Sequence, residues 1–191
     1  QLRFFSRQAK VEIHCFPDWE TLPYDSFSPH QDIVSQRLET LHRLPTIGRG
    51  ILLVPAGSLL QRLPPRGFID QYSLVLDNGD RLDLDNLRQR LDKAGYRCVA
   101  QVMEHGEFSV RGSILDLFPM GSNLPYRLDL FDDEIESIRT FNPETQLSIE
   151  KTQAIRLLPA REFPLDEQAI RRFRQTWREQ LEGDPQRSQI Y

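Results

Sequence analysis

The chain has 191 residues, enough for one large domain or two small ones with their own hydrophobic cores. Its hydrophobic content of 39% and charged content of 27% are ordinary for a soluble globular protein. The net charge is −4, from 24 basic and 28 acidic side chains, so the chain as a whole is not an electrostatic binder of nucleic acid. No apolar run approaches the roughly 18 residues that a membrane span needs, and no signal peptide is visible.

Two cysteines, Cys15 and Cys98, lie far apart in apolar, strand-like surroundings. They form neither a metal-binding spacing nor a disulfide framework, so we expect a reduced, cytoplasmic bacterial protein. The chain begins with Gln1 rather than methionine, and Leu2–Gln8 has the pattern of a helix end. We therefore expect the chain to be a fragment of a longer protein.

The first 70 residues alternate between strand and helix patterns, which is typical of an α/β fold. The apolar stretch Ile51–Val54, which ends at a proline, predicts a buried strand of a parallel sheet covered on both faces. Val34 and Leu38 begin an apolar stripe at helical spacing. The expected elements are a strand at 11–16, a loop at 17–30, a helix at 33–44, the strand at 51–54 and a short helix at 58–63.

The pattern changes near Gln71, where strand patterns begin to follow one another directly. Asn78-Gly79 is a strong signal for a hairpin or turn, and Leu84–Ala94 is an amphipathic helix with Gly95 as its C-cap. One helix beside consecutive strands predicts a mixed-sheet α+β domain at about 71–158, followed by a charged helix within 159–191. The strands expected in the insert lie at 98–103, 108–118, 126–131, 135–141 and 154–158.

The acidic stretch from Asp129 to Glu136 has the composition of a two-metal site. Its centre, Asp132–Glu134, lies between two strand patterns, where a hairpin turn places polar side chains, and we favour the turn. The histidines are scattered singly. The stretch TIGRGI at 46–51 lacks the lysine–hydroxyl pair of a phosphate-binding loop. We therefore expect no catalytic residue, no metal ion and no bound cofactor in this chain.

The stretch His105–Gly121 has the alternation of one strand spanning 108–118, with Arg111 on its polar side. Gly112 beside it indicates a bulge that would aim the arginine. In YRLDLFDDE the leucines would face the core, so Arg127 and Phe131 would share the polar face. An exposed aromatic beside arginines is the composition of a binding hot spot. The alternative is that Phe131 packs at the sheet rim and Arg127 pairs with Asp129, and the residues alone leave both open.

Two longer stretches carry a family resemblance. FPDWETLPYDSFSPHQDIVSQRLETL at 16–41 and VMEHGEFSVRGSILDLFPMGSNLPYRLDLFDDEIESIRTFNPETQ at 102–146 closely resemble the N-terminal part of the bacterial transcription-repair coupling factors, the Mfd family. This region is in turn similar to the nucleotide excision repair protein UvrB. The resemblance implies a degenerate RecA/UvrB-like α/β segment at 1–70, an inserted α+β domain at 71–158 that mimics the UvrA-binding domain of UvrB, and a C-terminal helix at 159–191 that returns to the first segment.

The resemblance also implies a function. The module would be non-catalytic and would recruit UvrA to stalled RNA polymerase during transcription-coupled nucleotide excision repair. UvrB strands that read much like R-G-x-F-R-V-R-G-x-x-x-D-I-F-P and R-V-E-L-F-D-x-E place Arg111, Arg127 and Phe131 on the arginines and aromatic that would bind UvrA. RNA polymerase, DNA, ATP and magnesium would be bound by other domains of the longer, ATP-hydrolysing translocase.

A second hypothesis is a nucleic-acid-binding or remnant ATPase module, because UvrB is a helicase-like protein. The acidic net charge and the absence of a visible phosphate-binding loop count against it. The stretch LPYDSFSPHQD at 22–32 is also far too short to be the tyrosine-rich hairpin with which UvrB clamps DNA. A metal-dependent nuclease built on Asp132–Glu136 has little support.

Overall fold

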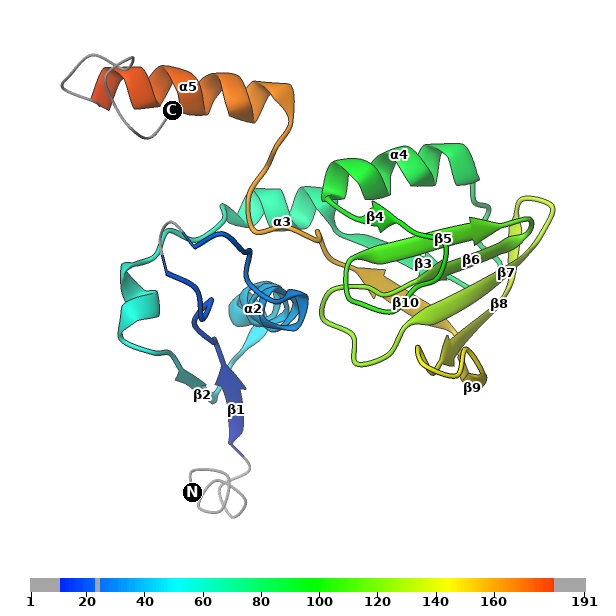
Figure 1. The fold of residues 1–191 in the computed structure, drawn as a ribbon. Helices are drawn as coiled ribbons and strands as arrows, with labels where there is room; N and C mark the ends of the chain where they lie inside the picture. The colour runs from blue at the N-terminus through cyan, green and yellow to red at the C-terminus, as the bar shows by residue number, and fades with distance from the viewer. Residues whose placement is uncertain (1–10, 23–24, 181–191) are drawn as a thin grey trace.

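The computed structural model describes residues 11–22 and 25–180, and the helix end expected at Leu2–Gln8 lies outside them (Figure 1). The first part of the chain carries a parallel pair of strands and two α-helices. Its elements are β1 (Glu12–Cys15), α2 (Gln31–Arg43), a 3-10 turn (Leu44–Thr46), β2 (Gly50–Leu53), a second 3-10 turn (Gly57–Leu60) and α3 (Arg66–Tyr72).

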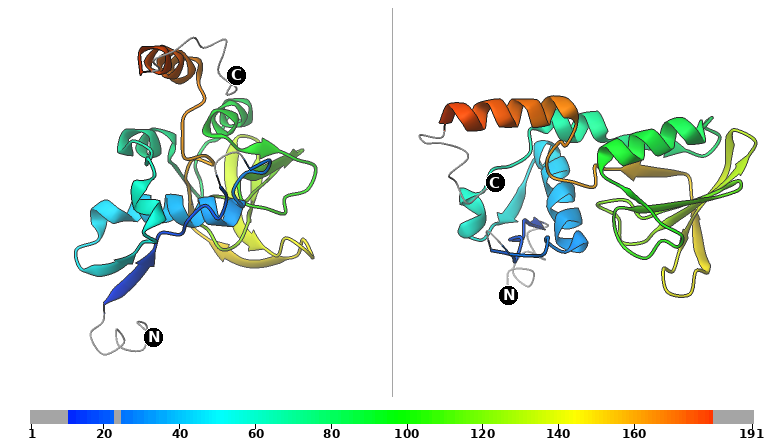
Figure 2. Two further views of the ribbon diagram at one scale, coloured as in Figure 1. Left: turned by 60° about the vertical axis from the view of Figure 1, so that its left-hand side comes forward. Right: turned by 45° about the horizontal axis from the view of Figure 1, so that its top comes forward.

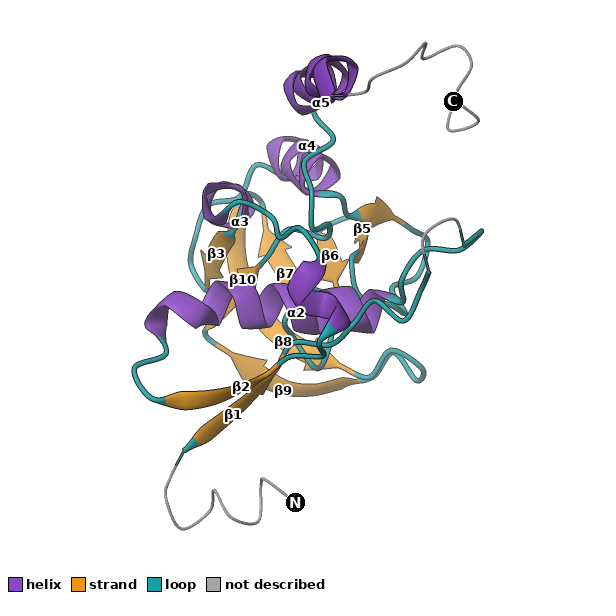
Figure 3. Ribbon diagram, turned by 90° about the vertical axis from the view of Figure 1, so that its left-hand side faces the viewer, coloured by secondary structure: helices purple, strands orange, loops and turns teal. Residues whose placement is uncertain are grey.

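Helix α2 begins where the sequence supplies a cap. The His30 side chain accepts a hydrogen bond from the backbone N–H of Asp32, and this aspartate lies near the positive end of the helix dipole. His42 and Arg43 lie in the last turn, at the negative end. Figure 3 shows α2 lying between the small β1–β2 sheet and the strands of the second part. The helix expected at 33–44 is therefore confirmed, and it joins the two halves.

Strands β1 and β2 pair in parallel, with Ile13 opposite Ile51. The parallel pairing agrees with the α/β pattern of this part, but the predicted double covering of β2 is wrong. Leu52 and Leu53 are 42% and 37% exposed, because in the described part of the chain the sheet has two strands and its outer face is open. An apolar run of this kind is typical of a strand buried on both faces, and here the strand is buried only in part.

The second part is built on a six-stranded mixed sheet with the order β4-β5-β6-β7-β8-β9. Strands β4 and β5 are parallel and the remaining neighbours are antiparallel. A separate antiparallel ribbon joins β3 to β10. The strands are β3 (Leu74–Asp77), β4 (Arg97–Cys98), β5 (Glu107–Arg111), β6 (Ile114–Leu117), β7 (Tyr126–Phe131), β8 (Glu134–Phe141), β9 (Ser148–Thr152) and β10 (Ala154–Leu157). The predicted α+β class is confirmed.

One helix, α4 (Leu84–Ala94), packs against this sheet and closes the core (Figure 1). Asp83 caps its start by accepting from two backbone N–H groups at 3.0 Å, and Gly95 ends it in the left-handed region with φ 95°. Its buried Leu87 and Leu91 belong to the main core. The sheet and ribbon contribute Leu115, Leu117, Leu128, Leu130, Ile135, Ile138, Ile155 and Leu157 to that core.

Two strand predictions are wrong, and one strand was not predicted. The expected single strand at 108–118 is a hairpin of β5 and β6 that turns at Gly112, whose φ is +60°. Of the strand expected at 98–103 only Cys98 is in a strand, the two-residue β4, after which the chain leaves the sheet edge and buries Val102 in a second, smaller core. Strand β9 was not expected, because its exposed sequence SIEKT has no apolar alternation. The Asn78-Gly79 turn is present, but it leads from β3 to an isolated bridge between Arg81 and Glu134 rather than into a paired hairpin strand.

The charged helix predicted after the insert is α5 (Glu167–Gln180). It extends away from the six-stranded sheet, over the side of the molecule that holds α2 and α3 (Figure 2). Its stripe is open: Phe173 is 63% exposed and stacks on Trp177 with 5.6 Å between ring centres. Within residues 11–22 and 25–180, no helix has the length and apolar character to cross a membrane.

Candidate functional site

The six-stranded sheet has one face in the core and one face that carries charged side chains, here called the polar face. Alternation along β7 places Leu128 and Leu130 in the core, and Arg127 and Phe131 on the polar face. The backbone register sets Asp116 of β6 directly opposite Arg127. The polar face comprises Arg111, Asp116, Arg127, Asp129, Phe131 and Arg139.

A buried carboxylate lies at the centre of this face. The Asp116 side chain is 1% exposed and accepts hydrogen bonds from two arginines. Arg127 donates from Nε to Oδ1 at 2.7 Å and from Nη2 to Oδ2 at 2.9 Å, which is the bidentate fork geometry. Arg111 donates from Nη2 to Oδ2 at 2.6 Å. One carboxylate therefore joins two of the three residues that the sequence predicts as partner-binding.

Arg127 makes two further contacts besides its hydrogen bonds to Asp116. Its Nη1 donates to the backbone oxygen of Gln146 at 3.2 Å, and its guanidinium lies 4.8 Å from the ring centre of Phe141. The hydrogen bond to Asp116 raises the pKa of Arg127 above its ordinary value, against the opposing effect of burial. Its side chain is 17% exposed, so Arg127 lies on the same face as Arg111 and Phe131 but is largely covered.

Arg127 is largely buried because loops pack over one end of the polar face. Val102 packs with Phe118 and Phe141 on that side, and Ser109 donates from Oγ to the Ala100 carbonyl at 3.3 Å. The Gln146 side-chain amide donates to the Val102 carbonyl at 3.2 Å and so joins two covering loops. These loops leave the other end of the face open.

Arg111 and Phe131 lie at the open end. The Arg111 side chain is 52% exposed, and Phe131, the last residue of β7, is 76% exposed. Phe131 pairs with Glu134 across a tight turn in which Asp132 adopts φ 60°. The structure therefore places an accessible aromatic and an accessible guanidinium on one face, with Arg127 behind them.

The sequence did not predict the three ion pairs of this face, which are Arg111–Asp116, Arg127–Asp116 and Arg139–Asp129. Asp129 pairs with Arg139 of β8 and also accepts from the Ser137 hydroxyl at 2.6 Å, so the considered Arg127–Asp129 pair is absent and the Arg127–Asp116 pair replaces it. The available signal for the latter was an aspartate in the middle of the apolar run ILDLF. A carboxylate there must face away from the core or be paired.

The acidic stretch after β7 forms the β7–β8 turn. Asp133 is exposed and lies 3.7 Å from Arg81, while Leu82 N–H donates to the Asp133 backbone oxygen. Among residues 11–22 and 25–180, no group of three His, Cys, Asp or Glu side chains is close enough to hold a metal ion. The stretch acts here as a connection between strands.

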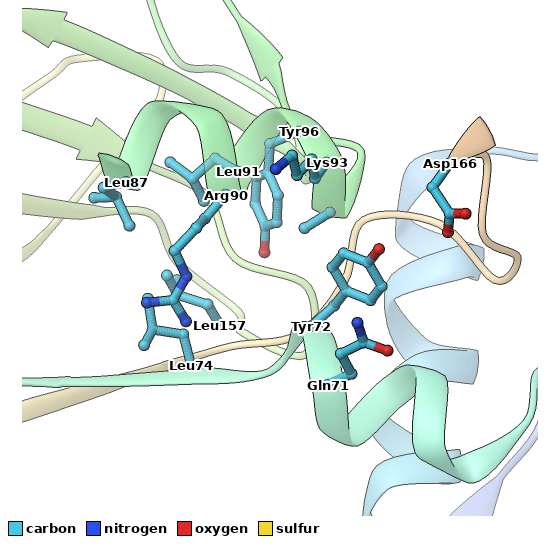
Figure 4. Close-up of a pocket in the computed structure, with 11 residues that line it drawn as sticks. Gln71, Tyr72, Leu74, Leu87, Arg90, Leu91, Lys93, Tyr96, Leu157 and Asp166 are labelled. Atoms are coloured by element: carbon cyan, nitrogen blue, oxygen red, sulfur yellow. The ribbon is translucent and has the colours of Figure 1, made fainter. Parts of the chain in front are cut away.

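A cavity of about 350 Å³ opens on the other side of the sheet domain, between α4 and the β3–β10 ribbon (Figure 4). Leu74, Leu87 and Leu157 give it an apolar wall, and Arg90 and Asp166 lie at its sides. None of the predicted partner-binding residues lines it. The candidate site is thus an open sheet face rather than a pocket, a shape that suits a macromolecular partner.

One comparison with known proteins matches the sheet domain, and others match most of the chain. Residues 74–163 match the family described as the UvrB interaction domain. The chain is 58% identical over 174 residues to the transcription-repair-coupling factor of Escherichia coli, and 50% identical over 187 residues to that of Haemophilus influenzae. The Bacillus subtilis protein of the same name is 36% identical over 132 residues.

These matches cover 91%, 96% and 69% of this chain respectively. The chain in turn spans 15%, 16% and 11% of the length of those relatives. The α+β sheet region is therefore a UvrB interaction domain. The chain that contains it belongs to the transcription-repair-coupling factor family.

Proposed function

We propose that this chain is a non-catalytic docking module that binds UvrA, and that it recruits UvrA to stalled RNA polymerase in transcription-coupled nucleotide excision repair. The family match supports a protein-binding role for residues 74–163. The names of the relatives support a link between transcription and repair. RNA polymerase and DNA would be engaged by other parts of the longer protein.

The observation that carries the proposal is the open end of the polar face. Phe131 is 76% exposed, in a position where folding alone gains little from an aromatic ring. Arg111, half exposed, keeps donors that can meet a carboxylate or carbonyl of the partner. An aromatic anchor and an arginine on one open face have the composition of an interface hot spot.

We also propose that the first part is a degenerate RecA/UvrB-like segment. The parallel β1–β2 pair and helix α2 support this reading, since parallel strands with helical connections are typical of such folds. Leu59 and Leu60 are 72% and 89% exposed, which is the surface that further strands or helices of a longer protein would cover. In this reading the first part carries the docking domain and hydrolyses no ATP.

Calorimetric titration of the purified chain with UvrA tests the proposed function. We expect saturable binding with one site, unchanged when ATP and magnesium are omitted from the cell. UvrB serves as the comparison titrant because the matched family carries its name. Binding to UvrB with no binding to UvrA would assign the surface to a different partner, and binding to neither would remove the proposal.

A further inference from the structure

The segment that leads into α4 lies against the β7–β8 turn. Arg81 forms an isolated antiparallel bridge with Glu134, the first residue of β8. On its other side Glu134 pairs with Phe131, the last residue of β7. The backbone N–H of Leu82 donates to the Asp133 carbonyl at 2.6 Å and fixes the segment to the turn. Phe131, Glu134 and Arg81 therefore lie in one row across three adjacent pieces of chain.

This row decides to which face of the sheet the Arg81 side chain belongs. Directly paired residues of antiparallel strands project their side chains to the same face of a sheet. Phe131 is on the polar face, so Glu134 and Arg81 are on it as well. The next residue agrees with this alternation, because Leu82 is 8% exposed and belongs to the main core. In the order of the sheet, Arg81 lies on one side of Phe131 and Arg111 lies on the other.

The Arg81 guanidinium is available to a partner, because its side chain is 80% exposed. The ion pair that it makes within residues 11–22 and 25–180, from Nη1 to Asp133 Oδ2, spans 3.7 Å, which is longer than a hydrogen bond. Exposed pairs of this kind contribute little to stability. Folding therefore gains little from an arginine at this position, and its N–H donors can meet a partner.

Arg81 is also the cation in an otherwise acidic corner of the surface. Asp133 and Glu134 are exposed beside it, and the exposed Asp132 precedes them in the turn. A partner's carboxylate that approached this corner would be repelled by these acidic side chains alone. The guanidinium offsets the repulsion and can bind the carboxylate with two parallel hydrogen bonds. Arg81 therefore decides whether an acidic group is accepted at this end of the polar face.

We infer that Arg81 is a further partner-contacting residue of the docking surface, and that it binds a carboxylate of UvrA on the side of Phe131 that lies away from Arg111. The inference rests on the proposed function. Arginine is enriched among the residues that dominate protein interfaces, especially beside an aromatic anchor. In this arrangement the Phe131 ring enters an apolar pocket of UvrA between two arginine contacts, and Arg81 supplies specificity for an acidic rim of that pocket.

Titrations of UvrA with three variants at this position test the inference. Arg81→Glu reverses the charge, and we expect it to weaken binding about tenfold, which corresponds to ~1.4 kcal/mol. Arg81→Ala should give a smaller loss, and Arg81→Lys, which keeps the charge, should remain closest to the parent. Backbone atoms hold the segment to the turn, including a hydrogen bond from Ile135 N–H to the Asp80 carbonyl at 2.9 Å, so the variants keep these bonds. Parent-like binding of Arg81→Glu would overturn the inference.

Arg88→Glu is the matched control, because it changes the net charge of the chain by the same amount. Arg88 lies on α4, which packs on the core face of the sheet, and its side chain is 47% exposed. We expect Arg88→Glu to bind UvrA like the parent. Equal losses for Arg81→Glu and Arg88→Glu would show an effect of net charge rather than a local contact, which contradicts the inference.

The same titrations separate the inference from the proposed function. If Phe131→Ala weakens UvrA binding while the Arg81 variants bind like the parent, the docking surface stands and the role of Arg81 fails. If neither position affects binding, the proposed surface itself fails. Tighter binding of Arg81→Ala would show a basic partner group at this end, which also contradicts the inference. Thermal melts run beside the titrations establish that each variant is folded, and Arg81→Ala decides the outcome if Arg81→Glu is not.

Discussion

Arg37 and Glu162 are 125 positions apart in the chain, yet they form a buried ion pair that joins helix α2 to the segment after β10. The Arg37 side chain is fully buried, with its guanidinium 4.1 Å from the Phe16 ring centre and 4.7 Å from that of Trp19. The indole N–H of Trp19 donates to the same carboxylate at 3.0 Å. This cluster is one of the polar links between helix α2 and the part of the chain that follows it.

Glu162→Gln is expected to destabilise the chain strongly, because it leaves the Arg37 charge buried without its partner. Removing one member of a buried pair typically costs about 3–5 kcal/mol, which lowers the melting temperature of a chain of this size by on the order of 10 °C. Arg43→Ala is the matched control, since Arg43 pairs with Glu39 at the surface and is 59% exposed. Its expected cost is below ~1 kcal/mol. Similar melting temperatures for both variants would contradict this account of the link.

Gly95→Ala is expected to destabilise the chain by more than ~1 kcal/mol, because this residue ends α4 with φ 95°. A Cβ at this position would also lie 2.5 Å from Cγ of Arg161. Gly67→Ala is the control: Gly67 lies inside α3 and a Cβ there meets nothing within 4 Å. In a helix that change stabilises by about 0.5–1 kcal/mol. Chemical denaturation of the three chains measures both effects, and a neutral Gly95→Ala would show that the C-cap is not required.

The stability of the chain is expected to fall as the pH drops below about 6.5, partly because of His42. Burial and the nearby Arg156 charge lower the pKa of His42, whose Nε2 lies 3.1 Å from Arg156 Nη1. Above the unfolded-state pKa of about 6.5 the imidazole is neutral in both states and contributes no pH dependence. Below it the unfolded chain takes up a proton that the folded chain resists, so stability is lost.

Replacing this histidine isolates its share of the pH dependence. His42→Gln should flatten the curve of unfolding free energy against pH between about 5 and 6.5, relative to the parent chain. Acidic groups that titrate at lower pH contribute equally to both curves. Parallel curves for the two chains would show that His42 is not the responsible group.

The parts of the fold that the sequence predicted well are those with strong local signals. Helix α4 has an N-cap, an apolar stripe and a glycine stop, and β7 has strict alternation, so both were predicted with their observed bounds. The β5–β6 hairpin was missed because the alternation of apolar and polar residues continues through the turn at Gly112. The sequence pattern of the hairpin is therefore the same as that of one long strand with a bulge. Strand β9 was missed because it is an exposed edge held by β8, without a pattern of its own.

In the candidate site, too, the features with a local sequence pattern were predicted and those that depend on tertiary contacts were not. Alternation along β7 was enough to place Arg127 and Phe131 on one face of the strand. The burial of Arg127 could not be predicted, since it depends on Phe141 at the end of the neighbouring strand β8 and on Gln146 in the loop after it. The positions of both depend on the sheet register and on how that loop folds back. The same holds for Asp116, whose two partners come from the strands on either side.

Phe131→Ala is the variant on which the account depends most. Because the ring is 76% exposed, its removal should leave the melting temperature within about 1–2 °C of the parent. Loss of a hot-spot aromatic should weaken UvrA binding by about thirtyfold, or ~2 kcal/mol. Phe173→Ala is the matched control, since Phe173 is 63% exposed but lies on α5, away from the polar face.

The most direct measurement is therefore the dissociation constant for UvrA of the parent, Phe131→Ala and Phe173→Ala chains by calorimetry, with a thermal melt of each. The account predicts a large loss of affinity for Phe131→Ala alone, with all three chains equally stable. Parent-like affinity of the folded Phe131→Ala chain would contradict it and leave the polar face as a solvated surface.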